Sequence, residues 1–253
     1  MLKKNLVGTC AIACLLLSAN FTYAQNLPSA EKVIDTYIEK TGGRMKYNAI
    51  KNAKFSGEMS IPAAGIKGTV DITFVAPDKF HFKADMGEFV GVQERGSNGK
   101  VVWENSTAQG ARLIKGDEAD QMLQEISMGT ILNPKKFYKS MKNAGKEKVN
   151  GEECYMLEMT KKNGDVDKDY YSVKSGLRIK SVKKVESPLG KIEVESFDKD
   201  YKKANNGLLV SWTGEQKVGP NSIVLKMKSV EFNGKVDKSK FAIPAEIKEL
   251  IDN

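Results

Sequence analysis

The stretch that decides the fold is IKGTVDITF at residues 66–74, followed by FHFKADM at residues 80–86. In both runs apolar and polar side chains alternate with a period of two, which is typical of strands with one buried face. Pro77 interrupts the pattern between them, because proline cannot donate a ladder hydrogen bond and favours a turn. Asn98-Gly99 then predicts a tight hairpin turn into a third run, Val101-Val102-Trp103. The sequence therefore predicts antiparallel strands whose common apolar face must be covered by another part of the chain.

The remainder of the chain continues this alternation, with helical periodicity at a few places. Further strands are expected at residues 54–61, 111–114, 153–160, 169–173, 177–185, 191–197, 208–212 and 223–232. Helices are expected at residues 29–41, 117–128 and 245–251, and another is expected to begin at Asn133-Pro134, with Phe137, Tyr138 and Met141 on its apolar side. In the helix at 117–128, Ala119, Met122, Leu123 and Ile126 recur at spacings of three and four, so this helix is amphipathic.

The N-terminus has the pattern of a secretory signal peptide. Lys3 and Lys4 form a basic start, residues 5–18 form an apolar run too short to span a bilayer, and Ala24 ends a small-residue cleavage site. We expect removal of residues 1–24, export to the periplasm, and one mature domain at residues 25–253. A retained membrane anchor and a lipoprotein signal with Cys14 as the lipidated residue are the alternatives.

Composition excludes some classes of function for the mature chain. Cys154 would be its only cysteine, so an internal disulfide cannot form, and its strand context favours a buried apolar role. The formal net charge of the whole chain is +8, but its lysine pairs are scattered over many predicted strands. We interpret them as a solvated surface rather than a nucleic-acid groove, while attraction to anionic lipid head groups, and hence docking on a membrane surface, stays open.

The search for catalytic residues finds no convincing set. His81 is the only histidine and lies on the polar face of a predicted strand, so a surface or cross-strand role is favoured over catalysis. Asp165, Asp167 and Asp169 alternate like the start of a calcium loop, but the glycine and the glutamate of such a loop are missing. These three aspartates are therefore expected on the solvent side of a hairpin. We predict a protein that is not an enzyme and has no cofactor or metal.

Three short segments carry a family resemblance. The runs GTVDITFVAPDKF at 68–80, NGKVVW at 98–103 and VDKSKFAIP at 236–244 resemble, in the same order, segments of the periplasmic lipoprotein-sorting carriers of the LolA/LolB type. The resemblance implies a mainly β (α+β) fold, a half-open antiparallel β-barrel with helices covering its concave face, where acyl chains bind. Ala76 stands where these carriers tend to have an arginine, so a role in outer-membrane lipoprotein sorting, with handover to a receptor, stays open, and binding of lipid or another hydrophobic ligand is the expectation.

We therefore expect an exported monomer that holds lipid or lipoprotein acyl chains in an apolar cavity, with the helix at 117–128 as a lid. A permanently packed helix is the alternative for that segment. For the whole protein, the alternatives are a structural or interaction module of the cell envelope without ligand and, ranked last, a hydrolase with an unrecognised site. The residues expected to line the cavity are apolar members of strand and helix patterns: Ile72, Phe74, Phe80, Phe82, Trp103, Met122, Leu123, Ile126 and Trp212.

Overall fold

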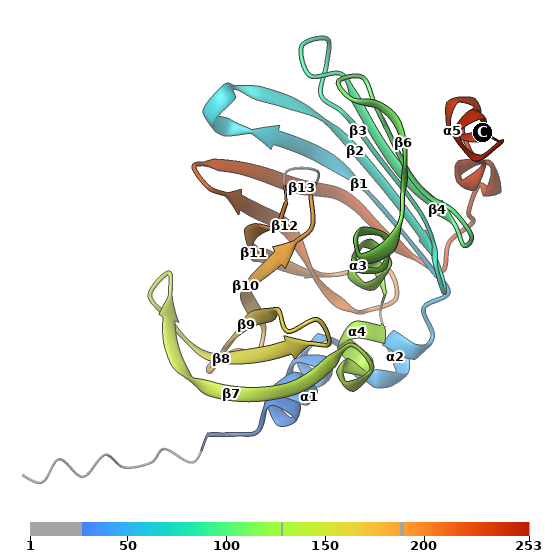
Figure 1. The fold of residues 1–253 in the computed structure, drawn as a ribbon. Helices are drawn as coiled ribbons and strands as arrows, with labels where there is room; N and C mark the ends of the chain where they lie inside the picture. Colours follow the sequence, from blue (N-terminus) through green and yellow to red (C-terminus); the bar gives the residue numbers. More distant parts are fainter. Residues whose placement is uncertain (1–26, 128, 188–189, 253) are drawn as a thin grey trace, which may run out of the picture.

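The computed structural model describes residues 27–127, 129–187 and 190–252. The expected signal peptide, and Met128 at the end of the predicted helix, lie outside these residues. Within them, thirteen antiparallel strands form one continuous sheet in the order β6-β5-β4-β3-β2-β1-β13-β12-β11-β10-β9-β8-β7. The sheet curves around a central space and its edge strands, β6 and β7, do not pair with each other, so the fold is the expected half-open β-barrel (Figure 1).

The strands are β1 (Asn52–Ile61), β2 (Ile66–Val75), β3 (Lys79–Asp85), β4 (Val92–Asn98), β5 (Val102–Ser106), β6 (Gly110–Ile114), β7 (Tyr138–Val149), β8 (Glu152–Lys161), β9 (Val166–Ser172), β10 (Arg178–Val185), β11 (Ile192–Lys203), β12 (Leu209–Val218) and β13 (Asn221–Phe232). The helices are α1 (Ala30–Thr41), α2 (Arg44–Asn48), α3 (Gly116–Ile126), α4 (Gly129–Leu132) and α5 (Ala245–Asp252), with short 3₁₀ turns η1 (Pro62–Ala64), η2 (Pro134–Lys136) and η3 (Lys238–Phe241).

The register of the strands defines two faces. Phe74 of β2 pairs with Phe80 of β3, and the row continues through Ser97 and Val102 to Ile114 of β6. Because side chains one residue apart point to opposite faces, the neighbouring row must lie on the other face. The first row belongs to the main buried core together with residues of α1, so it marks the concave face.

Helices cover this concave face. Ser29 caps α1 by accepting a hydrogen bond from the Lys32 backbone N–H at 3.2 Å, and Gly42 ends the helix with a φ of 134°. The buried stripe of α1, which includes Ile34 and Ile38, packs in the core with Leu157 of β8. The connection α3-α4-η2 joins the two edge strands of the sheet, so it crosses the open side of the half-barrel (Figure 1).

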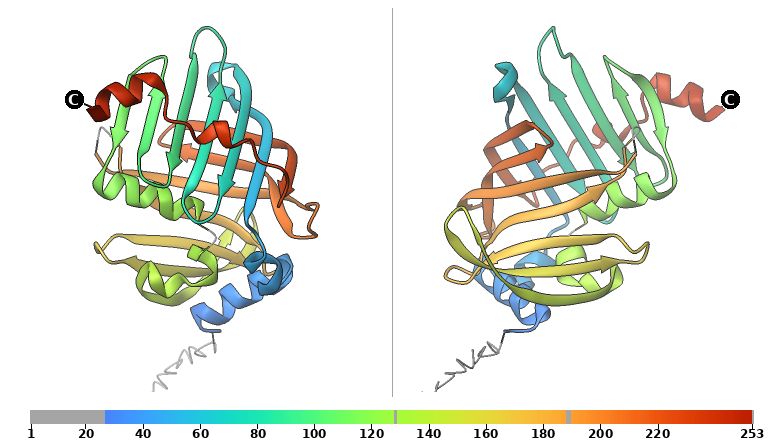
Figure 2. Two further views of the ribbon diagram at one scale, coloured as in Figure 1. Left: turned by 90° about the vertical axis from the view of Figure 1, so that its right-hand side faces the viewer. Right: turned by 60° about the vertical axis from the view of Figure 1, so that its left-hand side comes forward.

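The C-terminal segment covers part of the outer, convex face. η3 contacts β3 and β4, α5 contacts β6, and Ile247 of α5 is fully buried. Figure 2 shows this segment crossing the outer side of the strands formed by the first half of the chain. On the convex face of the other half, Cys154 is buried among Met156, Tyr170 and Phe197, as expected for an apolar cysteine.

The predicted helix beginning at Asn133-Pro134 is wrong. Only the turn η2 forms there, and β7 begins at Tyr138 and pairs with β8 along its length. The sequence of β7 is rich in lysine and its outer edge is exposed, so it lacks the apolar alternation that marks a strand. Pairing with β8, a long-range interaction, decides its conformation. Among the described residues, no helix is both long and apolar enough to cross a bilayer.

Candidate functional site

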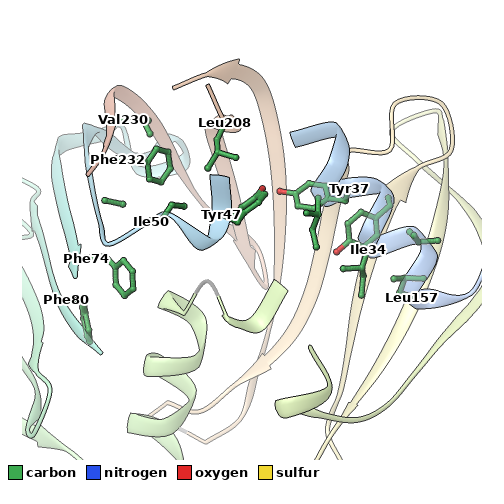
Figure 3. Packing of buried hydrophobic residues seen from close by; sticks show 14 of the residues in the cluster. Ile34, Tyr37, Tyr47, Ile50, Phe74, Phe80, Leu157, Leu208, Val230 and Phe232 are labelled. Atoms are coloured by element: carbon green, nitrogen blue, oxygen red, sulfur yellow. The ribbon is translucent and has the colours of Figure 1, made fainter. Parts of the chain in front are cut away.

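The concave side holds a cavity of about 280 Å³ between the helices α1–α4 and the strands β1 and β7–β13. One part of its wall is apolar and comes from segments that are distant in sequence. These apolar residues are Ile34, Ile50, Phe55, Leu208, Val210 and Phe232. Figure 3 shows several of them together with Tyr37 and Tyr47, whose hydroxyls point toward each other. Apolar walls with a few polar groups are usual for sites that bind small molecules.

Another part of the wall is ionic. Arg178 Nε donates to Asp198 Oδ2 at 2.7 Å, and the hydroxyl of Tyr201 donates to the Arg178 carbonyl at 2.9 Å. The carboxylate of Asp198 raises the pKa of Arg178 well above its ordinary value, so this guanidinium stays charged. The pair is thus a fixed charged element of the wall.

Asp167 is fully buried in the same wall and has two partners. The hydroxyl of Tyr138 donates to its Oδ2 at 2.9 Å, and Lys161 Nζ lies 3.0 Å from its Oδ1. Burial raises the pKa of Asp167 above its ordinary value of 3.8, although Lys161 opposes this effect. Its Oδ2 is therefore hydrogen-bonded, whereas its Oδ1 is ion-paired with Lys161 but accepts no hydrogen bond from the described residues.

Asp169 is only half satisfied. Its side chain belongs to a residue that is 6% exposed, and its Oδ2 accepts a hydrogen bond from the Tyr171 hydroxyl at 3.1 Å. Among the described residues, no donor reaches its Oδ1. A buried carboxylate oxygen without a donor costs free energy, because it has left water without replacing the lost hydrogen bond. Asp169 Oδ1 thus lacks a hydrogen-bond donor, like Asp167 Oδ1, but unlike that oxygen it has no ion-pair partner among the described residues either.

The expectation that these aspartates lie on the solvent side is wrong for Asp167 and Asp169. In β9 they share a face with Tyr171, which packs edge-to-face on Tyr37 of α1 at a centroid distance of 5.5 Å. Lys168 and Tyr170 of the same strand point to the convex side instead. The aromatic side chain of Tyr171 was the one signal in the sequence of β9 that this face points inward. The partners of the β9 side chains lie on β7, β8 and α1, so the sequence of β9 alone could not reveal them.

A second, more open cleft of about 500 Å³ lies on the other side of α3. Gln121, Gln124 and Lys161 line both the cavity and this cleft, so α3 separates one from the other. The side-chain oxygen of Gln121 accepts a hydrogen bond at 3.0 Å from the backbone N–H of Glu186, just beyond β10. One side of α3 is thereby attached to the second half of the sheet.

The start of α3 is attached to the first half of the sheet by an ionic network. Arg112 of β6 lies 2.7 Å from Glu118 in the first turn of α3 and also bonds Glu104. Glu104 is 3% exposed, and further donors reach it from Gln93 at 2.8 Å and Arg95 at 3.1 Å. Burial would raise the pKa of Glu104, but these donors outweigh it and hold the pKa below its ordinary value.

The nine residues expected to line a cavity lie in different places: eight are on the concave side of the sheet and one, Trp103, is on the convex side. Phe74 and Phe80 are buried in the concave core, and Ile72 and Phe82 are half-buried on the same face. The other concave-side residues are half-buried and pack on that core: Met122, Leu123, Ile126 and Trp212. Among the described residues that line the inner cavity, none belongs to these nine, whereas Leu123 lines the outer cleft. The stretch that decides the fold thus forms a wall beside the cavity, and Phe55, Leu208 and Val210 were missed.

Trp103 lies on the convex face. It pairs with Gly96, which pairs with His81, in the row adjacent to that of Phe80. Its indole lies over Gly96, where an added Cβ would come within 2.5 Å of the ring, and it is 1% exposed. His81 is buried beside it, with ring centroids 6.3 Å apart, and its Nε2 lies 2.5 Å from Glu94 Oε1 across the strands. His81 therefore has a cross-strand partner, on a face covered by the C-terminal segment.

Comparison with known proteins identifies the fold. No family model matches the sequence, and no curated protein matches it significantly. Solved structures match almost along their whole length: a DUF1329 family protein from Desulfovibrio piger has a TM-score of 0.56 at 15% identity, with 84% of this chain and 96% of that chain covered. A LolA superfamily protein from Nitrosomonas europaea has a TM-score of 0.54 at 11% identity, with 84% and 97% covered. The chain has a LolA-like fold.

A third match agrees with this result. A putative outer membrane lipoprotein-sorting protein domain from Vibrio parahaemolyticus has a TM-score of 0.52 at 14% identity, with 88% of this chain and 99% of that chain covered. At such identities the comparison shows the shared LolA-like fold alone. Among the described residues, no group of three or more His, Cys, Asp or Glu side chains is arranged to hold a metal ion.

Proposed function

We propose that this protein is an exported, non-enzymatic carrier that holds one acyl chain or a hydrophobic ligand of similar size in its concave cavity. The observation that carries the proposal is the cavity itself, about 280 Å³, with an apolar wall and a helix that separates it from an open cleft. A lipoprotein-sorting domain among the structural neighbours supports the same class of ligand. The expected signal peptide supports a periplasmic location.

The size of the cavity restricts what it can hold in this conformation. Its volume lies near the lower end of ligand pockets, which is roughly 300 Å³. Several acyl chains at once, as on a lipoprotein, would require α3 to move toward the cleft. The carrier therefore takes single-chain ligands in the closed form and larger ones only in an open form.

Docking on a membrane surface is the second part of the proposal. Phe89 is fully exposed and Val90 is partly exposed at the turn between β3 and β4, and the whole chain carries a net charge of +8. An exposed aromatic side chain on a basic protein can enter the interface of an anionic membrane, where acyl chains are obtained or released. Transfer between this protein and a membrane would take place at that surface.

Filling the cavity tests the carrier proposal. Val210 lines the cavity and is half-buried, so the larger side chain of Val210→Phe should occupy part of the free volume. The affinity of the protein for a fluorescent fatty acid should then fall at least about tenfold, the effect of roughly 1.4 kcal/mol. Val166→Phe is the matched control, because Val166 is exposed on β9 outside the cavity lining.

The ligand-free envelope module gives the opposite result. Wild-type protein would then bind no fatty acid, and native mass spectrometry of protein purified from the envelope would show no retained lipid. In a filled core, Val210→Phe would also overpack the interior and lower stability by about 1–3 kcal/mol. Unchanged affinity in a folded Val210→Phe variant would refute the assignment of this cavity.

A further inference from the structure

We propose that the cavity recognises a polar head group as well as a chain: its ligand is a single-chain amphiphile with a neutral, hydroxyl- or amide-bearing head group that donates a hydrogen bond to Asp169 Oδ1. The inference rests on the proposed carrier function and assigns the ligand class to the same cavity. A purely apolar cargo would require only an apolar wall. This wall also contains charged residues.

The unsatisfied oxygen of Asp169 indicates which polar group is missing. The carboxylate lies in the cavity wall and is almost completely buried, and its Oδ1 lacks a donor among the described residues. Protein atoms cover this oxygen, so a ligand donor reaches it only when the side chains around it shift. Its other oxygen is occupied by the Tyr171 hydroxyl. An ionised carboxylate only accepts hydrogen bonds, so the group that completes it must carry an O–H or N–H.

The charges around Asp169 favour a neutral donor over a charged one. Three carboxylates, Asp167, Asp169 and Asp198, share the cavity wall with three cations, Lys161, Arg178 and Lys183. When all six are ionised these charges balance, so a head group with a net charge would gain little from the wall and would lose its hydration. A hydroxyl or an amide N–H completes Asp169 without adding a net charge.

The arrangement of the two walls sets the orientation of the ligand. Asp169 lies on β9 opposite Ser181 of β10, whereas Phe55 of β1 and Val210 of β12 belong to the apolar part of the same cavity. An amphiphile would place its head group against β9 and β10 and its chain against β1 and β12. Its head group would then lie beside Lys161, where the cavity adjoins the outer cleft.

Two neutral probes with the same chain isolate this interaction. Monodecanoylglycerol carries free hydroxyl donors, whereas methyl decanoate carries the same acyl chain and an ester but no donor. Both compete with a fluorescent fatty acid on the full mature protein. We expect the glycerol ester to bind about tenfold more tightly, as a hydrogen bond to a charged group allows. In Asp169→Asn this preference should fall to about twofold or less.

Two further variants separate recognition from folding. Asp71→Asn is the matched control, because Asp71 is exposed on the convex side of β2, and it should keep the tenfold preference. Tyr171→Phe removes the donor to Oδ2 and leaves Asp169 with two acceptor oxygens without a donor, so the preference should increase. If Asp169→Asn fails to fold, an unchanged or smaller preference in folded Tyr171→Phe would overturn the head-group inference.

The outcomes distinguish failure of the head-group inference from failure of the proposed carrier function. If both esters bind wild-type protein equally, or if a folded Asp169→Asn variant keeps the preference, the head-group inference is overturned while the carrier function stands. Tighter binding of decanoate than of monodecanoylglycerol would also overturn it, because the cations of the wall would then dominate. If neither ester displaces the fluorescent fatty acid, the carrier function itself fails.

Discussion

The proposed role of α3 as a lid leads to a quantitative prediction about the ion pair at its start. Glu118 accepts two bonds from Arg112, at 2.7 and 2.9 Å, and both side chains are about one quarter exposed. Glu118→Gln removes this charge pair while Arg112 keeps its bonds to the buried Glu104. Because the pair is partly exposed to solvent, we assign it about 1 kcal/mol rather than the larger value of a buried pair.

This magnitude translates into an exchange rate. If α3 opens by detaching from Arg112, a loss of about 1 kcal/mol raises the open population about fivefold. Association and release of a fluorescent fatty acid should then both accelerate about fivefold in stopped-flow measurements, with little change in Kd, because ligand passes through the open form in both directions. High salt should reduce the difference between wild type and variant, since it screens the pair.

The control is Asp117→Asn, which neutralises an exposed acid in the same first turn of α3. It reproduces the loss of a favourable charge near the helix N-terminus without breaking the Arg112 pair. Equal exchange rates in wild type and in folded Glu118→Gln would refute the lid. So would a lower Tm with unchanged rates, because α3 would then be a permanently packed part of the core.

Two further predictions concern fluorescence and processing. Trp212 is half-buried against the concave core, with Lys202 Nζ 5.6 Å from its ring, whereas Trp103 is buried on the convex side. A saturable change in intrinsic emission on ligand binding should therefore persist in Trp103→Phe and vanish in Trp212→Phe, and the reverse pattern would contradict the assignment of faces. Intact-mass measurement of protein isolated from the envelope should give a chain that begins at Gln25, and a mass that retains Lys3 and Lys4, or an acyl group on Cys14, would contradict the signal peptide.

Local pattern was sufficient for much of the fold. The period of two in β2 and β3, the Asn98-Gly99 turn, and the stripes of α1 and α3 correspond to elements that form where they were expected. These signals are local, because the backbone geometry of a strand or helix fixes which side chains share a face. The mainly β, half-open barrel could be predicted for that reason, with the help of the three segments that resemble the LolA/LolB carriers.

Local pattern failed where the decision depends on distant partners. β7 has a polar sequence and becomes a strand because β8 supplies its hydrogen bonds. Trp103 belongs to a strand that is buried on both faces, so alternation alone could not indicate which face meets the cavity. Only the C-terminal segment, more than a hundred residues later in the chain, makes the convex side of that strand a second buried surface.

The candidate site depends even more on tertiary structure. From the sequence, Asp167 and Asp169 were predicted to face the solvent, because an isolated carboxylate is costly to bury. The hydroxyls of Tyr138 and Tyr171 and the ammonium of Lys161 offset this cost, and they reach the aspartates from β7, from two residues along the same strand, and from β8, respectively. The sequence by itself determined a one-sided sheet that needed a cover. The tertiary structure decided where the uncovered space remains and which charges line it, because burial of a charge is a property of its partners and not of its own position in the chain.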